Sequence, residues 1–568
     1  MNNTPTGLIA AKRLAVAVAA VCATLAAPAF ATDDVKNVLD LMLKKGVITQ
    51  QDYDQFMKDN ADAAENKQFK EKRLDDDVTK SVKFMQKREK DGAVKPSGFG
   101  WVSEDGKNEV NLTGRLHYDA RVFDNNFGTY VDRDSSAMGD RFTARRARLG
   151  VSGVFNKDFT YEMVANLTGT NANATNSTSS TSFVDTAWLN YLTSSAFQVR
   201  VGKFKQPFGL ETLTSSNNID FMERSYQDQI APGKQLGVML HGDINPNTVY
   251  AISAYQKDFD PASSSGSLAP QMAARLATNL AKVFGANDNV LFHVGVAGTV
   301  GRYQVVPTTS SQSGNNIETK GAFVSFSDEN SGLRNVFRNR IYGTTPCSTT
   351  AATACTYGGY GLAASEAATI SKNMFGLEFA AAYSGTKFQA EYSKSAFSAN
   401  SRTSNTANYY ATQSKGDVQV YYVQLVHNIT GESWASAYRG GVLGSIKPNS
   451  NFNFKDMSGT GAWQMSARYS KYDASNFGAN AAGGETKYDS TGGASTSTTE
   501  AYSIEGSPVG NTATIGLNWI LNPNARIMLN YSISKFETTF TPVDITGETA
   551  GQQGNIEKII SLRSQFNF

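Results

Sequence analysis

The chain has 568 residues, of which 18% are charged and 11% aromatic, and its 53 basic and 51 acidic residues nearly balance. That balance provides no net charge with which to attract nucleic acid, so none is expected as a partner. No stretch after the first thirty or so residues approaches the ~20 consecutive apolar residues of a membrane helix, which excludes a helical membrane protein.

The first residues have the features of an export signal. Lys12 and Arg13 precede an apolar run over residues 14–27, and Ala29 and Ala31 supply the small residues that a signal peptidase needs. We predict a signal peptide over residues 1–31. The alternative, a membrane anchor, fits less well because the apolar run is short. Cleavage would remove two basic residues and no acidic one, leaving 51 of each. Any preference for anions must then come from where the charges lie.

Residues 32–95 differ in pattern from everything after them. Val35, Val38, Leu39, Met42 and Leu43 recur at helical spacing, and a charged stretch with helical composition follows. We predict a periplasmic helical segment over residues 32–95. It is either a coiled-coil trimerisation stalk or a solvated linker containing one helical hairpin, and the pattern does not choose between them.

From residue 109 the hydrophobic period becomes two. In the first such stretch Arg115, His117 and Asp119 share one face, while Leu112 and Tyr118 share the other. Repetition of this pattern over several hundred residues, without amphipathic helices, predicts an all-β transmembrane antiparallel barrel of 16 strands over residues 96–568. The candidate strands are residues 109–121, 141–155, 158–168, 183–193, 196–205, 234–242, 248–257, 271–282, 290–303, 372–383, 387–397, 417–428, 461–472, 512–521, 526–536 and 557–568. Two weaker candidates, residues 321–326 and 437–446, would exceed sixteen, and we expect one or both to be loop.

The stretch GKFKQPFGLE (residues 202–211) ends the fifth candidate strand. Alternation stops at Pro207, which cannot donate to a sheet ladder, and a long polar connection follows. If the barrel interior is wet, this connection must lie over the mouth or fold inward. We predict an inward-folded constriction loop at about residues 206–233, with Lys203 and Lys205 at the narrowest point.

Two further features concern the end of the chain and its cysteines. The last residues, IISLRSQFNF, alternate in polarity and end on Phe568, which is typical of strands read by the outer-membrane insertion machinery. Cys22 leaves with the signal, so Cys347 and Cys355 remain in a Ser/Thr/Ala-rich segment. In an exported protein they predict a local disulfide, the alternative being two free thiols.

Several segments together resemble the phosphate-selective porin O and P family. They are GKFKQPFGLE (202–211) with ERS (223–225), GKQLGV (233–238), FQAEYS (388–393), TGESWASAYRGGV (430–442), GTGAWQMSARYS (459–470), TIGLNWILNPNARIMLNY (514–531) and LRSQFNF (562–568). The resemblance implies a homotrimer of sixteen-stranded barrels in the bacterial outer membrane that takes up phosphate or related anions. The family's central phosphate-binding lysines have no residue-by-residue match here.

Basic side chains predicted to line the lumen make an anion pathway the leading functional hypothesis. Guanidinium groups stay charged and offer forked donors to phosphate oxygens. The candidates are Arg115, Arg121, Arg146, Arg148, Arg200, Lys203, Lys205, Arg224 and Lys234. Acidic Glu211, Asp220 and Glu223 on the constriction loop could face this basic wall and set a transverse field, which would favour a broader channel.

The leading hypothesis is a passive, anion-preferring porin in contact with outer-membrane lipid. Its expected solutes are phosphate or polyphosphate. A general solute porin remains open, as does a barrel adhesin, which would explain the Ser/Thr-rich stretches at 170–182 and 304–371. An enzyme is not predicted, because the sequence has no G-x-S-x-G elbow or phosphate-binding glycine loop. The four histidines form no metal-ligand pattern with cysteines or carboxylates, so neither a metal nor another cofactor is predicted.

Overall fold

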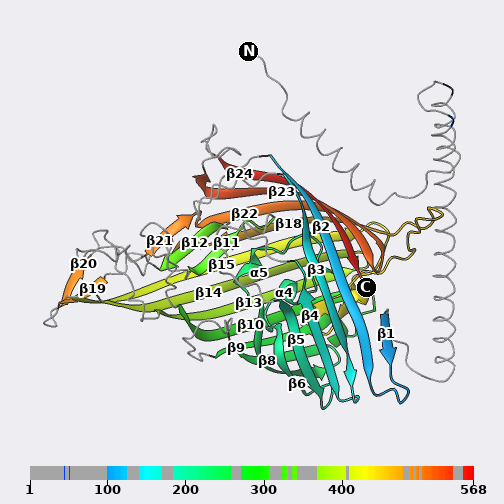
Figure 1. Ribbon diagram of the computed structural model, residues 1–568, viewed down its shortest axis with the longest axis horizontal. Coiled ribbons are helices and arrows are strands. Elements are labelled where there is room, and N and C mark those ends of the chain that lie inside the picture. The colour runs from blue at the N-terminus through cyan, green and yellow to red at the C-terminus, as the bar shows by residue number, and fades with distance from the viewer. Residues whose placement is uncertain are drawn as a thin grey trace. The chain divides into compact units, whose positions relative to one another are not determined.

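A computed structural model describes residues 44, 50, 99–124, 140–168, 183–256, 270–305, 322–330, 335–341, 368–404, 408–476, 485–489, 494–497, 502–540 and 554–568 (Figure 1). The predicted signal peptide, nearly all of the 32–95 segment and both Cys347 and Cys355 lie outside these residues and remain predictions. The chain forms two compact units that divide after Asn111. The first contains β1 (Phe99–Val102), and the second contains the barrel.

Sixteen antiparallel strands form the closed barrel, which confirms the predicted fold class and strand number. The sheet closes where the last strand pairs with the first, from Arg115 opposite Asn567 to Phe123 opposite Ile559. In order the strands are β2 (Glu109–Phe123), β3 (Arg141–Phe155), β4 (Phe159–Asn166), β5 (Val184–Leu192), β6 (Gln198–Lys205), β7 (Lys234–Asn245), β8 (Thr248–Gln256), β9 (Gln271–Asn279), β10 (Val290–Val305), β13 (Ala368–Tyr383), β14 (Thr386–Ser404), β15 (Asn408–Asn428), β18 (Ala462–Asp473), β22 (Val509–Asn522), β23 (Ala525–Phe540) and β24 (Gly554–Asn567).

Alternating polarity decides which face of each strand turns inward. Along β18, Gln464, Arg468 and Ser470 are buried, whereas Met465 between them is 59% exposed. Successive side chains of a strand point to opposite faces, so the polar positions share the lumen and the apolar positions share the outer surface. Among the described helices, none combines the length and apolar composition needed to cross a bilayer.

The two ends of the barrel differ in their connections. At one end β13 turns into β14 through Ser384 and Gly385 alone, and β7 turns into β8 as tightly. At the other end lie long connections, including residues 206–233 between β6 and β7, the fifth and sixth strands. In barrels of this type short turns face the periplasm. The predicted strand at 271–282 is shorter than expected, because β9 stops at Asn279 and the chain continues into α6 (Leu280–Val283).

Neither of the two weaker strand candidates belongs to the barrel wall, as the count of sixteen requires. Instead of loop, however, each forms a small sheet. Strand β11 (Ala322–Ser327) pairs with β12 (Asn335–Ile341), which pairs with β21 (Tyr502–Gly506). Strands β16 (Tyr438–Arg439) and β17 (Val442–Leu443) form a hairpin. Backbone groups packed away from water need hydrogen-bond partners, and these short pairings supply them. Strands β19 (Glu485–Asp489) and β20 (Ala494–Ser497) extend the sheet from the outer end of β15.

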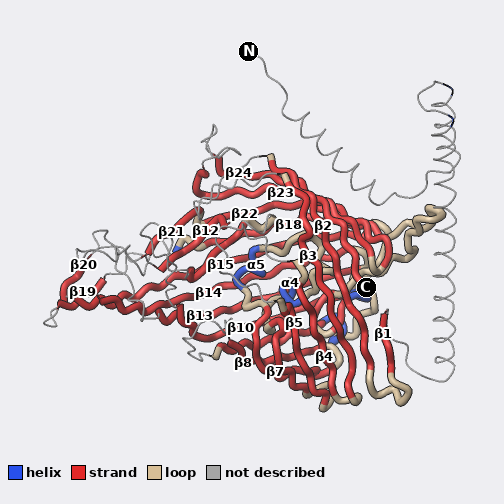
Figure 2. The backbone as a smooth tube through the Cα atoms, in the orientation of Figure 1, coloured by secondary structure: helices blue, strands red, loops and turns tan. Residues whose placement is uncertain are grey.

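The connection over residues 206–233, the constriction loop, lies inside the ring of strands and carries α4 (Leu210–Leu213) and α5 (Tyr226–Ile230) (Figure 2). Phe208 is fully buried against Gly376 of the wall, where an added Cβ would come within 2.8 Å of its ring. Gly209 has a φ of 78°, which glycine adopts without strain. The backbone N–H groups of Leu210 and Glu211 then donate to Glu391 of β14, at 2.8 and 2.7 Å. The PFGLE sequence therefore fixes the loop to the wall.

A second segment also enters the barrel, from the end with short turns. Residues 434–446, here called the periplasmic insert, belong to the long connection between β15 and β18. Trp434, Leu443 and Ile446 are buried in a core that includes Leu210 of the constriction loop and Val426 of the wall. Apolar burial thus joins the insert, the loop and the barrel into one packed body.

Candidate functional site

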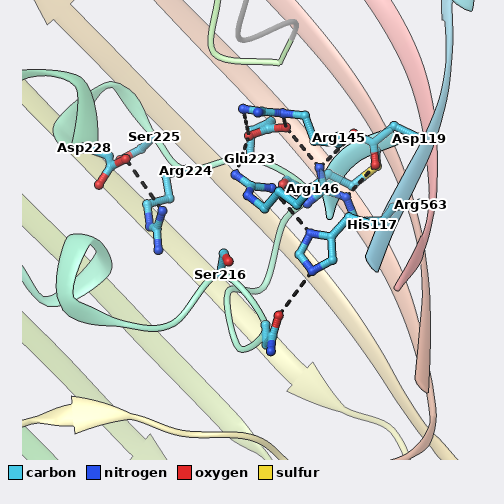
Figure 3. Close-up of polar contacts among 12 residues, drawn as sticks. His117, Asp119, Arg145, Arg146, Ser216, Glu223, Arg224, Ser225, Asp228 and Arg563 are labelled. Carbon is cyan, nitrogen blue, oxygen red and sulfur yellow. Dashed lines mark hydrogen bonds and ion pairs between the residues drawn. The ribbon is translucent and has the colours of Figure 1, made fainter. Parts of the chain in front are cut away.

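The constriction loop attaches to one side of the lumen through Glu223 (Figure 3). Its carboxylate accepts hydrogen bonds from Arg121 at 2.7 Å, Arg145 at 2.8 Å and Arg563 at 3.0 Å, and lies 3.5 Å from Arg146. These four arginines come from β2, β3 and β24, neighbouring strands on the seam where the barrel closes. One loop carboxylate therefore binds four guanidinium groups of the wall.

Asp119 completes this cluster from the wall itself. It pairs with Arg563 at 2.7 Å and with Arg121 at 2.8 Å, and both partners are almost fully buried. Burial alone would raise the pKa of Glu223, but Arg145, Arg146, Arg563 and Arg121 hold it well below its usual range. Glu223 is therefore ionised at neutral pH and serves as the counter-ion of the wall arginines.

Two further acidic residues of the loop are also bound to the wall, whereas the fourth, Asp228, lines the cavity described below. Asp220 accepts a hydrogen bond from Lys387 at 2.7 Å, and Glu211 lies 3.2 Å from Arg468. Burial raises the pKa of Glu211, with Arg468 and Ser225 opposing that shift. Glu211, Asp220 and Glu223 are each at most 6% exposed. Each of these carboxylates therefore forms direct ion pairs with cations of the wall.

A cavity of about 720 Å³ lies beside the loop, against β2 to β9 and the periplasmic insert, and shares Arg146 with the Glu223 cluster. Its lining has eight basic and four acidic residues. The basic ones are Arg115, Arg146, Arg148, Arg200, Lys205, Arg224, Lys234 and Arg275, and the acidic ones are Glu162, Asp185, Asp228 and Asp243. The described wall of this cavity is therefore predominantly basic.

The lining cations differ in how fully they are neutralised. Arg275 is bound by Glu378 at 2.6 Å, and Asp185 is shared between Arg148, at 3.0 Å, and Lys234. Lys205 instead donates to the backbone carbonyls of Thr212, Leu213 and Thr214, which carry no net charge.

Arg224 likewise donates to the carbonyls of Glu211 and Thr214, with Asp228 3.7 Å away. Arg115 donates to the hydroxyl of Ser216 at 2.7 Å. Arg200 stacks on Trp188, with its Cζ 4.1 Å from the ring centroid. In the described part of the chain, Arg115 and Arg200 make no ion pair within 4 Å.

A family model described as phosphate-selective porin O and P matches residues 110–320 and 360–568. The chain belongs to this family. The protein is accordingly an outer-membrane porin of bacteria, and it is a channel rather than an enzyme. The family assignment made from the sequence segments is confirmed.

Solved structures that resemble this porin include OmpT of Vibrio cholerae, at 8% identity and a TM-score of 0.38, which covers 82% of this chain and 100% of its own. The outer membrane channel DcaP of Acinetobacter baumannii has 12% identity and a TM-score of 0.39, covering 83% and 99%. An anion-selective porin from Comamonas acidovorans has 10% identity and a TM-score of 0.39, covering 81% and 100%. A search of curated protein sequences gave no match.

Seven of the nine sequence-predicted pathway residues line the cavity of this porin. The other two lie elsewhere. Arg121 belongs to the Glu223 cluster, and Lys203 donates to the carbonyl of Val184 at 3.0 Å. Gly202 has a φ of 128°, and Phe204, two residues further on, lines the cavity. Period two counted from the inward Arg200 places Phe204 on the cavity side and Lys203 with Val201 on the opposite face, so the alternation itself did not support a lumenal Lys203.

Sequence reasoning missed several cations that hold the loop of the porin, namely Arg145, Arg468, Lys387 and Arg563. Alternation along the last strand already placed Arg563 on the inward face, so a signal for it was present. Arg145 had no such signal. Alternation from the inward-facing Arg146 of β3 puts Arg145 on the outer face, yet both side chains contact Glu223.

His117 is fully buried and contacts Asn217 of the loop at 3.2 Å and Arg146 at 3.5 Å, so it forms part of the polar wall. No group of three or more metal-ligating side chains occurs among the residues that the structure describes.

Proposed function

We propose that this porin is a passive, anion-preferring diffusion channel, with phosphate or polyphosphate as its physiological solute, and that it assembles as a homotrimer. The observation that carries the anion preference is the segregation of charge about the constriction loop. Glu211, Asp220 and Glu223 are bound to wall cations, while the cavity beside the loop has eight basic residues, one of which, Arg146, also contacts Glu223, against four acidic ones. Of the four loop carboxylates, only Asp228 therefore remains at the cavity to oppose the field of its basic wall.

An anion that enters the cavity loses part of its hydration shell, and conduction requires sites that replace those contacts without trapping the ion. A guanidinium about 4 Å from the anion contributes ~4 kcal/mol at an effective dielectric near 20, and less where water fills the lumen. Arg115 and Arg200 have no carboxylate within 4 Å among the described residues, so their charge is reduced only by the more distant Glu162 and, for Arg115, by Asp185. Several such sites of moderate strength favour passage over retention.

The test is a planar-bilayer recording of the purified porin in a KCl gradient, followed by addition of inorganic phosphate. We expect a reversal potential that indicates chloride preference, and block of the current by phosphate. Preference for potassium would contradict the proposal in favour of a general porin, and an absence of channels would favour an adhesin. Indifference to phosphate would overturn the choice of solute alone. The mass of the detergent-solubilised particle tests the trimer.

Matched variants assign the preference to the cavity. Replacing Arg115→Gln and Arg148→Gln removes two lining charges, and we expect the chloride preference to fall. Arg302→Gln is the control, because Arg302 is an exposed residue of β10 outside the cavity lining. Equal effects of both changes would mean that the cavity charges do not set the selectivity.

A further inference from the structure

The cavity beside the constriction loop has an apolar side as well as a basic one. Strands β7 and β8 turn Met239, Val249 and Ala251 toward it, and Val442 of the periplasmic insert adds another aliphatic side chain. A channel for small hydrated ions alone has no need of such a surface, because apolar side chains offer an ion no replacement for lost hydration. We call Met239, Val249, Ala251 and Val442 the apolar strip.

Sheet pairing places this strip next to a guanidinium that makes no ion pair within 4 Å among the described residues. Arg200 of β6 lies directly opposite Met239 of β7. Side chains at directly opposite positions have Cβ atoms about 4.5–5.5 Å apart. One strand further, His241 lies opposite Ala251 and Asp243 opposite Val249, so Ala251 and Val249 continue the same inward face. A cation and an apolar surface therefore lie side by side.

Arg200 is also held in a fixed orientation. Its guanidinium stacks on the indole of Trp188 at 4.1 Å, and the Trp188 ring is itself held by a hydrogen bond from its Nε1 to Glu162 at 3.2 Å. Its Nε atom is buried and has no hydrogen-bond partner among the described residues. A stacked guanidinium loses little freedom when it binds a planar carboxylate through two parallel hydrogen bonds.

We propose that the Arg200 site selects small organic carboxylates that carry an apolar group, such as aromatic monocarboxylates, over equally charged polar anions. The carboxylate binds the guanidinium of Arg200, and the attached ring lies along the apolar strip. The cavity, at about 720 Å³, has room for such a molecule together with water. This inference rests on the proposed anion preference and adds a choice among anions to it.

Benzoate and nicotinate provide the test, because at neutral pH both are planar monoanions of nearly the same shape, and nicotinate has a ring nitrogen where benzoate has a CH. Their permeabilities through the purified porin are measured in the planar bilayer from reversal potentials against chloride. Relative to their ratio of mobilities in free solution, we expect benzoate to be favoured roughly threefold, about the effect of burying one further apolar group. A ratio equal to that in free solution would overturn the inference.

Variants then locate the effect. Met239→Gln combined with Val249→Thr keeps size and charge but makes the strip polar, and we expect the benzoate advantage to disappear. Val238→Thr is the control, since Val238 is 49% exposed on the outer face of the same strand. General damage to the channel lowers both permeabilities, whereas loss of the strip lowers their ratio. An unchanged ratio in the double variant would contradict the assignment.

These outcomes separate the inference from the proposed function. The comparison between two monoanions of equal charge stays readable even if the porin shows no preference for chloride over potassium, in which case the anion preference alone fails. Conversely, chloride preference with no advantage for benzoate leaves the anion channel intact and removes the organic substrate class.

Discussion

Glu223 shows how a single side chain can set the position of a whole loop. Its carboxylate contacts Arg121, Arg145, Arg146 and Arg563, and without it Arg145 and Arg146 would have no carboxylate partner within 4 Å among the described residues. Breaking a buried ion pair by removing one partner costs about 3–5 kcal/mol. We expect Glu223→Gln to release the constriction loop, which single-channel recordings would show as a larger and noisier conductance.

The control for this change is Asp228→Asn on the same loop. Asp228 makes one long contact, 3.7 Å to Arg224, and its side chain is 32% exposed, so its loss should leave the conductance steady.

The pKa of Glu223 in the folded protein lies well below the ordinary value of 4.5. The stability that ionised Glu223 contributes is therefore fully present above pH 4.5, and it is lost only as the pH falls through the lower, folded-state pKa. The wild-type conductance level should therefore persist from about pH 8 to about pH 5. A noisy wild-type channel at pH 5 would contradict this account.

At the scale of elements, the periplasmic insert packs against the constriction loop and supports it from the end of the barrel with short turns. Trp434 is 1% exposed, and Lys387 lies over its ring at 3.9 Å while also binding Asp220 of the loop. Truncation of a buried tryptophan to alanine costs about 3–5 kcal/mol. We expect Trp434→Ala to loosen both segments and raise the conductance, measured in the same bilayer recordings.

Trp463→Ala is the matched control, because it removes the same side chain from β18, just after the connection that contains the insert. Trp463 stacks on Trp519 with ring centroids 5.1 Å apart, and its Nε1 donates to Thr460 rather than to the insert or the loop. A similar rise in conductance in both variants would mean that general weakening of the barrel, not release of the insert, is responsible.

The strands were predictable from the sequence because each has one wet and one apolar face, and that contrast leaves a period of two. The same rule located Arg115, Arg148 and Arg200 on the cavity wall. It failed where the contrast is absent. Residues 438–443 lie inside the barrel, packed between Leu210 and Arg275, so the short pairing of β16 with β17 left no alternation to read. Which carboxylate binds which arginine depends on how the loop folds back, which no local pattern records.

At the scale of the whole molecule, we propose that a chain with 53 basic and 51 acidic residues acquires its selectivity by separating them. Three of the four loop carboxylates, Glu211, Asp220 and Glu223, lie in ion pairs with wall cations, and an excess of basic groups lines the cavity beside the loop. Selectivity of this origin acts through the electrostatic field in a water-filled space, so salt must weaken it.

The screening length is ~10 Å at 0.1 M salt and ~3 Å at 1 M. As the salt concentration rises, the charges of the cavity wall are therefore screened from ions near the middle of the cavity. We expect the permeability ratio of chloride to potassium, taken from reversal potentials at a fixed KCl gradient, to fall toward that of free solution over this range. Arg115→Gln with Arg200→Gln should flatten the salt dependence, while the exposed Arg302→Gln should preserve it. A ratio that stays constant with salt would instead require an anion held in direct contact, and the selectivity would then belong to one binding site and not to the field of the cavity.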